Sequence, residues 1–310
     1  MIPKIIHQIW FQDSNKSKIF SNKIEFNYNK IIKSNIPFEL KYDMISIIAK
    51  NPKYYYLLWN ENLIKKFLIK NYPNIYLLYK NLEFMIQKID LAKYIILYHF
   101  GGIVVDVDVK AIKSFDYFFK LFKNDGIYFS KMPKFNDLEK FATQLVYKFE
   151  MNYDYINNGI IISRPNHPIL MDFVNNISIN KQTNNDCFYM AKVFNITGPA
   201  MVTNTIYSNK LKYNDLFILN NIYFEPCYGK DITCNIGNNT ICFHKHKSVW
   251  ISNWHNKMNI LLKFIFNNLF SLIVDSASFI YFVFLRGFKI IYLIIILYFL
   301  INNFKSKKYT

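Results

Sequence analysis

Residues 86–110, IQKIDLAKYIILYHFGGIVVDVDVK, contain the pattern that decides the fold. They predict an amphipathic helix, a break at Gly101 and Gly102, and a short β-branched strand that ends in two aspartates. Alternate residues of a strand point to the same face, so Asp106 and Asp108 can share one cation. Carboxylates suit Mg²⁺ or Mn²⁺, and such sites usually hold the ion together with substrate phosphates. The pattern indicates a metal-bound diphosphate, although a bare D-x-D more often marks a solvated strand end.

The predicted helix carries an acid and a base within an apolar face. Ile86, Asp90, Lys93, Leu97 and Phe100 follow one another at steps of three and four residues and therefore share one side of the helix. The charged residues form either a buried ion pair or a group held for a polar ligand. Burying charge for structure alone is weakly rewarded, which favours the ligand.

These residues resemble the DXD core of the glycosyltransferase family 32 sugar transferases, which include the inositol-phosphoceramide mannosyltransferases and the yeast initiating α-1,6-mannosyltransferase. The matching core positions are Asp90, Tyr94, Leu97, Gly101, Gly102, Ile103, Asp106 and Asp108. Further matching elements follow in the family's order: residues 2–10 (IPKIIHQIW), 158–159 (NG), Pro168, 197–199 (TGP) and the His/Ser/Trp cluster at 244–250. The resemblance spans about residues 1–255.

The resemblance implies a GT-A-type nucleotide-diphospho-sugar transferase fold and a catalytic role for Asp106, Asp108 and Asp90. The two DXD aspartates would bind Mn²⁺ or Mg²⁺, and Asp90 would hold sugar hydroxyls. Lys93 would contact hydroxyls or phosphate. Asn158 is a further donor-pocket candidate, although turn chemistry alone also explains an Asn there.

The segment CFHKHKSVWISNW, residues 242–254, is a second candidate region. The family places a metal-binding His or Ser here. His244 and His246 would share a face if the segment is a strand, and either is a candidate third metal ligand. Ser248 and Trp250 resemble the family's closing element, which packs over the donor. Trp10 could stack on the nucleotide base, although a lone Trp on a strand is more often part of a core.

The donor implied by the resemblance is a GDP- or UDP-sugar, with GDP-mannose favoured. Transfer would retain the anomeric configuration, and the acceptor would be a glycan or a lipid. Two departures from the family bear on the donor. Lys93 stands where the family usually has Arg, and Val104 where it usually has Tyr. Lys offers a point charge and no planar fork, so donor identity is affected more than metal binding.

Two other functions fit parts of the sequence. Residues 106–109, DVDV, also match the nucleophile motif of haloacid-dehalogenase-type phosphatases. Those enzymes need a later acidic pair, and no Asp-Asp follows in this chain. A non-catalytic, membrane-anchored protein that binds sugar nucleotide or glycan is the second alternative, favoured by Lys93 and Val104.

The charge of +17 does not indicate a nucleic-acid partner. Arg164 and Arg286 are the only arginines, and the lysines are scattered among Asn, Ile and Tyr without a basic block. A basic chain favours anionic donors and anionic lipid surfaces instead. The four cysteines contain no C-x-x-C, so a structural zinc site is not expected.

The C-terminal segment is strongly apolar. Residues 290–301, IIYLIIILYFLI, lack any polar side chain other than tyrosine, and the extension to 287–304 approaches the length needed to span a bilayer. We therefore expect a transferase domain at 1–257 and a membrane-associated segment at 258–310, as a helix or hairpin with a basic tail. The N-terminus lacks a secretory signal, which places the catalytic domain on the cytosolic side.

The remaining elements predict an α/β fold with a mainly parallel central sheet. Expected strands lie at 4–10, 38–44, 103–107, 126–130 and 155–163. Expected helices lie at 60–70 and 81–100, with Asn60 and Asn81 as N-caps. In such sheets ligands bind beyond the carboxyl ends of the strands, where Asp106 and Asp108 fall.

Overall fold

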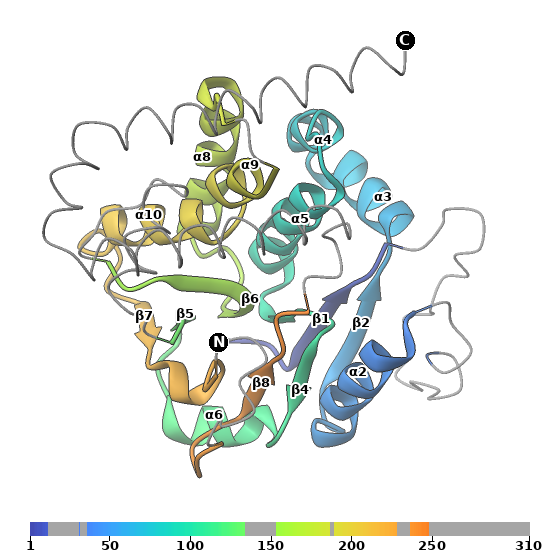
Figure 1. The fold of residues 1–310 in the computed structure, drawn as a ribbon, viewed down its shortest axis with the longest axis vertical. Coiled ribbons are helices and arrows are strands. Elements are labelled where there is room, and N and C mark those ends of the chain that lie inside the picture. Colours follow the sequence, from blue (N-terminus) through green and yellow to red (C-terminus); the bar gives the residue numbers. More distant parts are fainter. Residues whose placement is uncertain (12–30, 32–35, 134–152, 187–188, 228–235, 248–310) are drawn as a thin grey trace, which may run out of the picture. The chain divides into compact units, whose positions relative to one another are not determined.

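The computed structural model describes residues 1–11, 31, 36–133, 153–186, 189–227 and 236–247. Among these residues, six strands form a central sheet in the order β2-β1-β3-β6-β5-β7 (Figure 1). Their bounds are β1 Ile5–Ile9, β2 Tyr55–Trp59, β3 Gly102–Val105, β5 Ile127–Lys131, β6 Ile156–Ser163 and β7 Leu216–Leu219. A separate two-stranded ribbon pairs β4, Val109–Ala111, with β8, Cys242–His244.

The sheet is mixed. Strand β1 is parallel to β2 and β3, and β5 is parallel to β7, whereas β6 is antiparallel to both β3 and β5. The predicted α/β class and a mostly parallel sheet are therefore confirmed, with β6 as the exception. All eight residues of β6 are buried, and the predicted strand at 155–163 falls on it.

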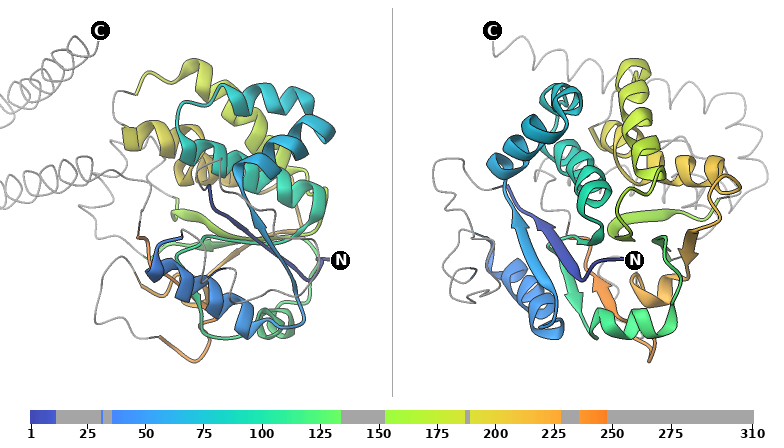
Figure 2. Two further views of the ribbon diagram at one scale, coloured as in Figure 1. Left: turned by 90° about the vertical axis from the view of Figure 1, so that its right-hand side faces the viewer. Right: turned by 180° about the vertical axis from the view of Figure 1, so that it is seen from behind.

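Helices cover both faces of the sheet (Figures 1 and 2). The larger layer comprises α3 Glu61–Asn71, α4 Pro73–Lys80, α5 Met85–Phe100, α8 Ile169–Thr183, α9 Tyr189–Ile196 and α10 Pro199–Asn209. The opposite face carries α2 Phe38–Lys50, α6 Phe115–Leu121 and the β4–β8 ribbon, and the short 3₁₀ helix η1 spans Asn221–Tyr223. Because β3 is covered on both sides, Val104 packs into one core cluster and Ile103 and Val105 into the other. The family's tyrosine position is thus filled here by a buried core residue.

Two local predictions were wrong. Residues 38–44, predicted as a strand, lie in the helix α2, which buries Leu40, Asp43, Met44 and Ile47. The helix predicted at 81–100 begins later, because α4 precedes it and Asn81 is the C-cap of α4. Asn60 is the N-cap of α3 as expected, and its side chain accepts from the Leu63 N–H.

The glycine pair after α5 fixes the course of the chain into β3. Gly101 has φ of 63° and Gly102 has φ of 96°, values that side chains rarely allow. A Cβ at Gly102 would lie 2.5 Å from the Ile5 carbonyl oxygen. The pair therefore lets β3 lie directly beside β1, and the two aspartates follow at the carboxyl end of β3.

Among the helices of the described residues, none combines the length and the apolar character needed to cross a bilayer. The predicted membrane segment at 258–310, together with Ser248 and Trp250, lies outside the described residues. Of the cysteines that are described, Cys242 is a buried free thiol and Cys227 is disulfide-bonded.

Candidate metal and donor site

The two aspartates lie in the turn that joins β3 to β4, and not on the strand itself. Strand β3 ends at Val105, and the Asp106 N–H donates to the Gly159 carbonyl of β6. Gln8 also fixes this turn, because its side-chain amide nitrogen Nε2 donates to the Asp106 carbonyl at 3.1 Å. The carboxylates are thus brought together by a held turn, whereas strand alternation was the predicted reason.

His244 joins the aspartates through the β4–β8 ribbon. Val109 is paired with His244 across the ribbon, which places the imidazole beside the turn. His244 Nε2 lies 3.2 Å from Asp108 Oδ1. One potential ligand atom from each of Asp106, Asp108 and His244 lies within 4.8 Å of the other two. Two carboxylates and one imidazole are a donor set that suits Mn²⁺ or Mg²⁺, so these residues fit a divalent cation.

His246 occupies a different position. Strand β8 ends at His244, and His246 follows with a φ of 48°, so the two residues do not share a strand face. Its ring stacks on that of His244 with a centroid separation of 4.0 Å, and its Nε2 lies 2.8 Å from Oε2 of Glu225. Glu225, His244 and His246 form a second group with closely spaced ligand atoms.

The electrostatics of the turn differ between its two aspartates. Burial raises the pKa of Asp106, although Lys93 and His244 partly offset this effect. For Asp108, burial also acts to raise the pKa, but His244 and the Lys247 N–H outweigh it and the pKa lies below its ordinary value. Burial acts to lower the pKa of His244, and the carboxylates of Glu225 and Asp108 nevertheless raise it well above 6.5.

Asp90 and Lys93 form a buried pair on α5 with a separation of 3.3 Å. Lys93 Nζ also lies 2.7 Å from Asp106 Oδ1. Burial acts to lower the pKa of Lys93, but the charges of Asp106 and Asp90 outweigh it and raise the pKa. The first of the two alternatives, a buried ion pair, is therefore confirmed, and Lys93 also contacts Asp106. That these charges are held for a polar ligand stays a prediction.

Side chains from two other segments of the chain donate hydrogen bonds to the Asp90 carboxylate. Oδ1 accepts from Asn158 Nδ2 at 3.0 Å, and Oδ2 accepts from the Thr197 hydroxyl at 3.0 Å. Tyr94 completes the arrangement by donating to the Thr197 carbonyl at 2.7 Å. Burial raises the pKa of Asp90 to about 6, even though Lys93 acts in the opposite direction. The predicted pocket residues Asp90, Lys93 and Asn158 are thus brought together.

Trp10 lies farther from these charges. It packs against a small cluster of buried residues that includes Val107, which separates the two aspartates. Its backbone N–H donates to the Trp59 carbonyl at 2.9 Å. The ring is partly exposed, which is compatible with the predicted stacking on a base.

Several residues that build the site carry little signal in the sequence. Glu225 stands alone between Phe224 and Pro226, with no motif spacing to mark it. Gly159 is required by close packing, because a Cβ there would lie 2.5 Å from His244 Cε1 and 3.2 Å from Asp106 Oδ2. Its place in residues 157–159, NNG, was the available signal.

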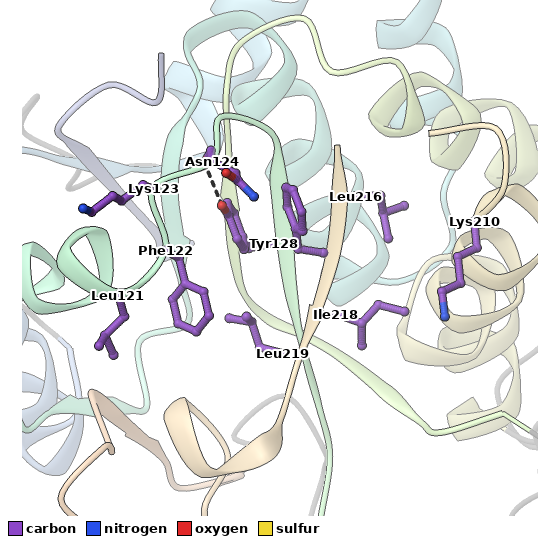
Figure 3. Close-up of a pocket in the computed structure, with 10 residues that line it drawn as sticks. Leu121, Phe122, Lys123, Asn124, Tyr128, Lys210, Leu216, Ile218 and Leu219 are labelled. Carbon is purple, nitrogen blue, oxygen red and sulfur yellow. Dashed lines mark hydrogen bonds between the residues drawn. The ribbon is translucent and has the colours of Figure 1, made fainter. Parts of the chain in front are cut away.

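A shallow cavity of about 560 Å³ lies elsewhere, along the edge strand β7 (Figure 3). Its walls come from the end of α6, from β5 and from β7, and the Tyr128 hydroxyl donates to the Asn124 carbonyl at 2.7 Å beside it. None of the predicted site residues lines this cavity. Figure 3 shows mostly apolar side chains there together with Lys123 and Lys210, and none of the lining residues is a carboxylate or an imidazole that could hold a cation.

Comparison with known proteins finds a family match over part of the chain. Residues 37–129 match the family described as the glycosyltransferase sugar-binding region containing the DXD motif. This part of the chain is similar to the DXD-containing glycosyltransferases. The match covers α5, the glycine pair and both aspartates, which confirms the resemblance seen in the sequence.

Individual relatives support the same family. A glycosyltransferase of Acanthamoeba polyphaga mimivirus is 29% identical over 73% of this chain and 74% of its own length. Inositol phosphoceramide mannosyltransferase 1 of Schizosaccharomyces pombe is 29% identical over 37% of this chain and 30% of its own length. The chain therefore matches less than a third of that yeast enzyme.

Solved structures give more remote likenesses. Mouse xyloside xylosyltransferase 1 has a TM-score of 0.43 at 9% identity, over 80% of this chain and 99% of its own. The galactosyltransferase LgtC has a TM-score of 0.40 at 10% identity, over 78% of this chain and 87% of its own.

Proposed function

We propose that this glycosyltransferase is metal-dependent, adopts the GT-A fold, and moves a sugar from a nucleoside-diphosphate donor to a glycan or lipid acceptor. The observation that carries the proposal is the convergence of Asp106, Asp108 and His244 beyond the carboxyl end of β3. Lys93 adds a buried cation directly beside this group. Metal ligands and a nearby positive charge are what the anionic diphosphate of such a donor needs in order to bind.

Mn²⁺ or Mg²⁺ bound to these three side chains would supply Lewis-acid stabilisation of the charge that develops on the leaving diphosphate. The chain's own residues prepare the site for that charge. The Lys247 N–H holds Asp108 Oδ2 at 2.8 Å, and the Lys93 ammonium holds Asp106. These contacts fix both carboxylates before substrate arrives, which avoids reorganisation during the reaction.

Asn158, Lys93 and Asp90 would form the sugar side of the pocket. The Asp90 carboxylate already accepts from Asn158 and Thr197, so it would orient these neighbours in addition to holding sugar hydroxyls. Asn158 and Lys93 would then present their hydrogen-bond donors to hydroxyl or phosphate oxygens. Trp10 would stack on the base, and Ser248 and Trp250 would close over the donor.

The donor we favour is GDP-mannose, with a UDP-sugar as the alternative, and we propose that the sugar's anomeric configuration is retained. Mannose is supported by the name of the yeast relative, an inositol phosphoceramide mannosyltransferase. That name also suggests a lipid acceptor. A membrane-associated segment at 258–310 beside a transferase domain at 1–257 would give this domain access to such an acceptor.

Release of nucleotide from GDP-mannose and from UDP-sugars, with and without Mn²⁺, tests the proposal. We expect release of GDP or UDP that requires Mn²⁺ or Mg²⁺ and stops when a chelator is added. Product analysis by NMR distinguishes retention from inversion. Donor turnover that is unchanged in excess EDTA would overturn the metal-dependent mechanism. Absence of turnover and of binding with every donor would overturn the proposed activity.

A further inference from the structure

Glu225 is a deeply buried carboxylate that the proposed chemistry does not use. It follows η1 and its side chain is 1% exposed. Its oxygens are reached by three groups: Asn157 Nδ2 at 2.6 Å, His244 Nδ1 at 2.9 Å and His246 Nε2 at 2.8 Å. A buried carboxylate with this many partners stays where it is and constrains them.

Two groups lie against Nδ1 of His244: an oxygen of Glu225 and the amide nitrogen of Asn157. The Asn157 Oδ1 atom accepts from the Gly159 N–H at 2.9 Å, which fixes the orientation of the amide and leaves Nδ2 facing Glu225. An ionised carboxylate is only an acceptor. Asn157 Nδ2 also lies 3.0 Å from His244 Nδ1, so the tautomer is set by what Nε2 binds. When Nε2 binds the cation, the proton of a neutral ring lies on Nδ1, and the Glu225 oxygen at 2.9 Å is its acceptor.

With its Nδ1 proton committed to Glu225, His244 is left with Nε2 toward the aspartates. Nε2 lies 3.2 Å from Asp108 Oδ1, within the group suited to a cation. A ligating histidine commonly donates its other N–H to a carboxylate, which sets the ring orientation and makes the ligand nitrogen more basic.

Glu225 also reaches Asp108 by a second route. Its Oε2 binds His246, and the next residue, Lys247, donates its N–H to Asp108 Oδ2 at 2.8 Å. Glu225 is thus connected to two of the three candidate ligands: to His244 directly, and to Asp108 through residues 246–247.

We propose that Glu225 is a positioning residue of the metal site, which holds His244 in the Nδ1–H form and fixes the turn that holds Asp108. This inference rests on the proposed metal-dependent function and assigns Glu225 no contact with substrate. Glu225→Gln preserves size but introduces an N–H donor among three existing donor groups. His244 can then turn or change tautomer, and its Nε2 lone pair is no longer presented to the cation.

The test compares Mn²⁺ binding to the full chain, measured by electron paramagnetic resonance with GDP and with UDP present. We expect Glu225→Gln to weaken Mn²⁺ affinity by roughly 10- to 100-fold, the range typical of such supporting carboxylates. Asp172→Asn is the matched control, because Asp172 contacts Tyr213 and Lys212, away from the ligand group. It should bind Mn²⁺ as the wild type does.

A double-mutant cycle separates positioning from general destabilisation. If Glu225 acts through the ligands, adding Glu225→Gln to His244→Ala should cost less affinity than Glu225→Gln costs alone. Full additivity, or wild-type affinity in Glu225→Gln, overturns the inference while leaving the proposed function intact. Failure of the wild type to bind Mn²⁺ overturns the metal-dependent function as well.

A measurement on the wild type removes dependence on the folding of the variant. Long-range ¹H–¹⁵N correlation of the imidazoles, in protein loaded with diamagnetic Mg²⁺ or Cd²⁺, reports the tautomer of each ring. His244 is assigned by its absence from the spectrum of His244→Ala. We expect a proton on Nδ1 and none on Nε2. A proton on Nε2 would mean that Glu225 does not set the ligand form.

Discussion

The ammonium group of Lys93 lies 2.7 Å from the carboxylate of Asp106, with the Lys93 side chain only 3% exposed. The first aspartate of the DXD motif is therefore already paired with a cation from α5. Asp90, one turn earlier on the helix, shares the same ammonium group at 3.3 Å. Lys93 thus links Asp90 on the same helix to Asp106 in the turn between β3 and β4. A metal ion bound at that turn would lie near a fixed positive charge.

Lys93→Ala should destabilise the protein by about 3–5 kcal/mol, because it leaves two carboxylates without their buried partner. Urea denaturation at pH 7 measures the change in the free energy of unfolding. Lys65→Ala is the control, because its pairing with Glu61 at 2.8 Å is partly exposed and should contribute less than about 1 kcal/mol. Equal losses in the two variants would contradict a structural role for the Lys93 pair.

Asp108→Asn should reduce metal-dependent turnover by more than about 100-fold. This loss exceeds the effect typical of a residue that only supports a metal ligand. The substitution keeps the shape of the side chain and removes the charge. Nucleotide release at saturating Mn²⁺ is the measurement, with circular dichroism as the check on folding. Wild-type turnover in a folded variant would exclude Asp108 as a ligand.

Gly159→Ala should disturb the metal site sterically. The added Cβ would lie 2.5 Å from Cε1 and 2.8 Å from Nδ1 of His244, so the imidazole has to move. Overpacking of this kind costs about 1–3 kcal/mol, and we expect weaker Mn²⁺ binding in addition. Thermal unfolding and Mn²⁺ titration provide the readouts.

Gly237→Ala is the matched control for that substitution, since nothing lies within 4 Å of a Cβ built at Gly237. It should leave both Mn²⁺ affinity and stability close to the wild type. If Gly159→Ala behaves in the same way, His244 does not pack against this backbone as closely as described.

His7 makes stability depend on pH. Burial lowers its pKa to about 4, although the hydrogen bond to the Gly101 carbonyl acts in the opposite direction. The unfolded chain takes up this proton near pH 6.5, whereas the folded protein does so only near pH 4. Stability is therefore full above pH 6.5 and is lost as the pH falls toward 4, by about 3 kcal/mol in total.

His7→Gln should remove this part of the acid sensitivity. Urea denaturation of wild type and variant at pH 7, 5.5 and 4.5 gives the comparison, and the difference in stability between the two proteins should shift in favour of the variant as the pH falls. His99→Gln, at an exposed side chain, should keep the wild-type dependence. Parallel curves for His7→Gln and wild type would show that His7 is not buried in its neutral form.

Membrane association is a prediction about residues 258–310. Carbonate extraction of the full-length chain should leave it in the membrane pellet, while a chain truncated after Asn256 should be released and still bind donor. Extraction of the full-length protein into the soluble fraction would contradict the assignment. Protease protection then reports the side of the membrane on which the transferase domain lies, which we predict to be the cytosolic side.

The sequence by itself determined the elements whose signals are local. Apolar periodicity, a glycine break and β-branched residues place α5 and β3, and the side chain of Asn60 caps α3. These features depend on residues a few positions apart, so they can be recognised without any knowledge of distant contacts. The spacing of Asp90, Lys93, Asp106 and Asp108 predicts where the candidate site lies, and the structure brings these four residues together.

Only the tertiary structure decided how that site is assembled. His244 reaches Asp108 because β8 pairs with β4, and Glu225 reaches His244 from a third segment. The helix at 38–50 and the antiparallel direction of β6 likewise depend on which surfaces they pack against. Such contacts join residues far apart along the chain, and their energies come from burial and pairing that exist only once the sheet has formed.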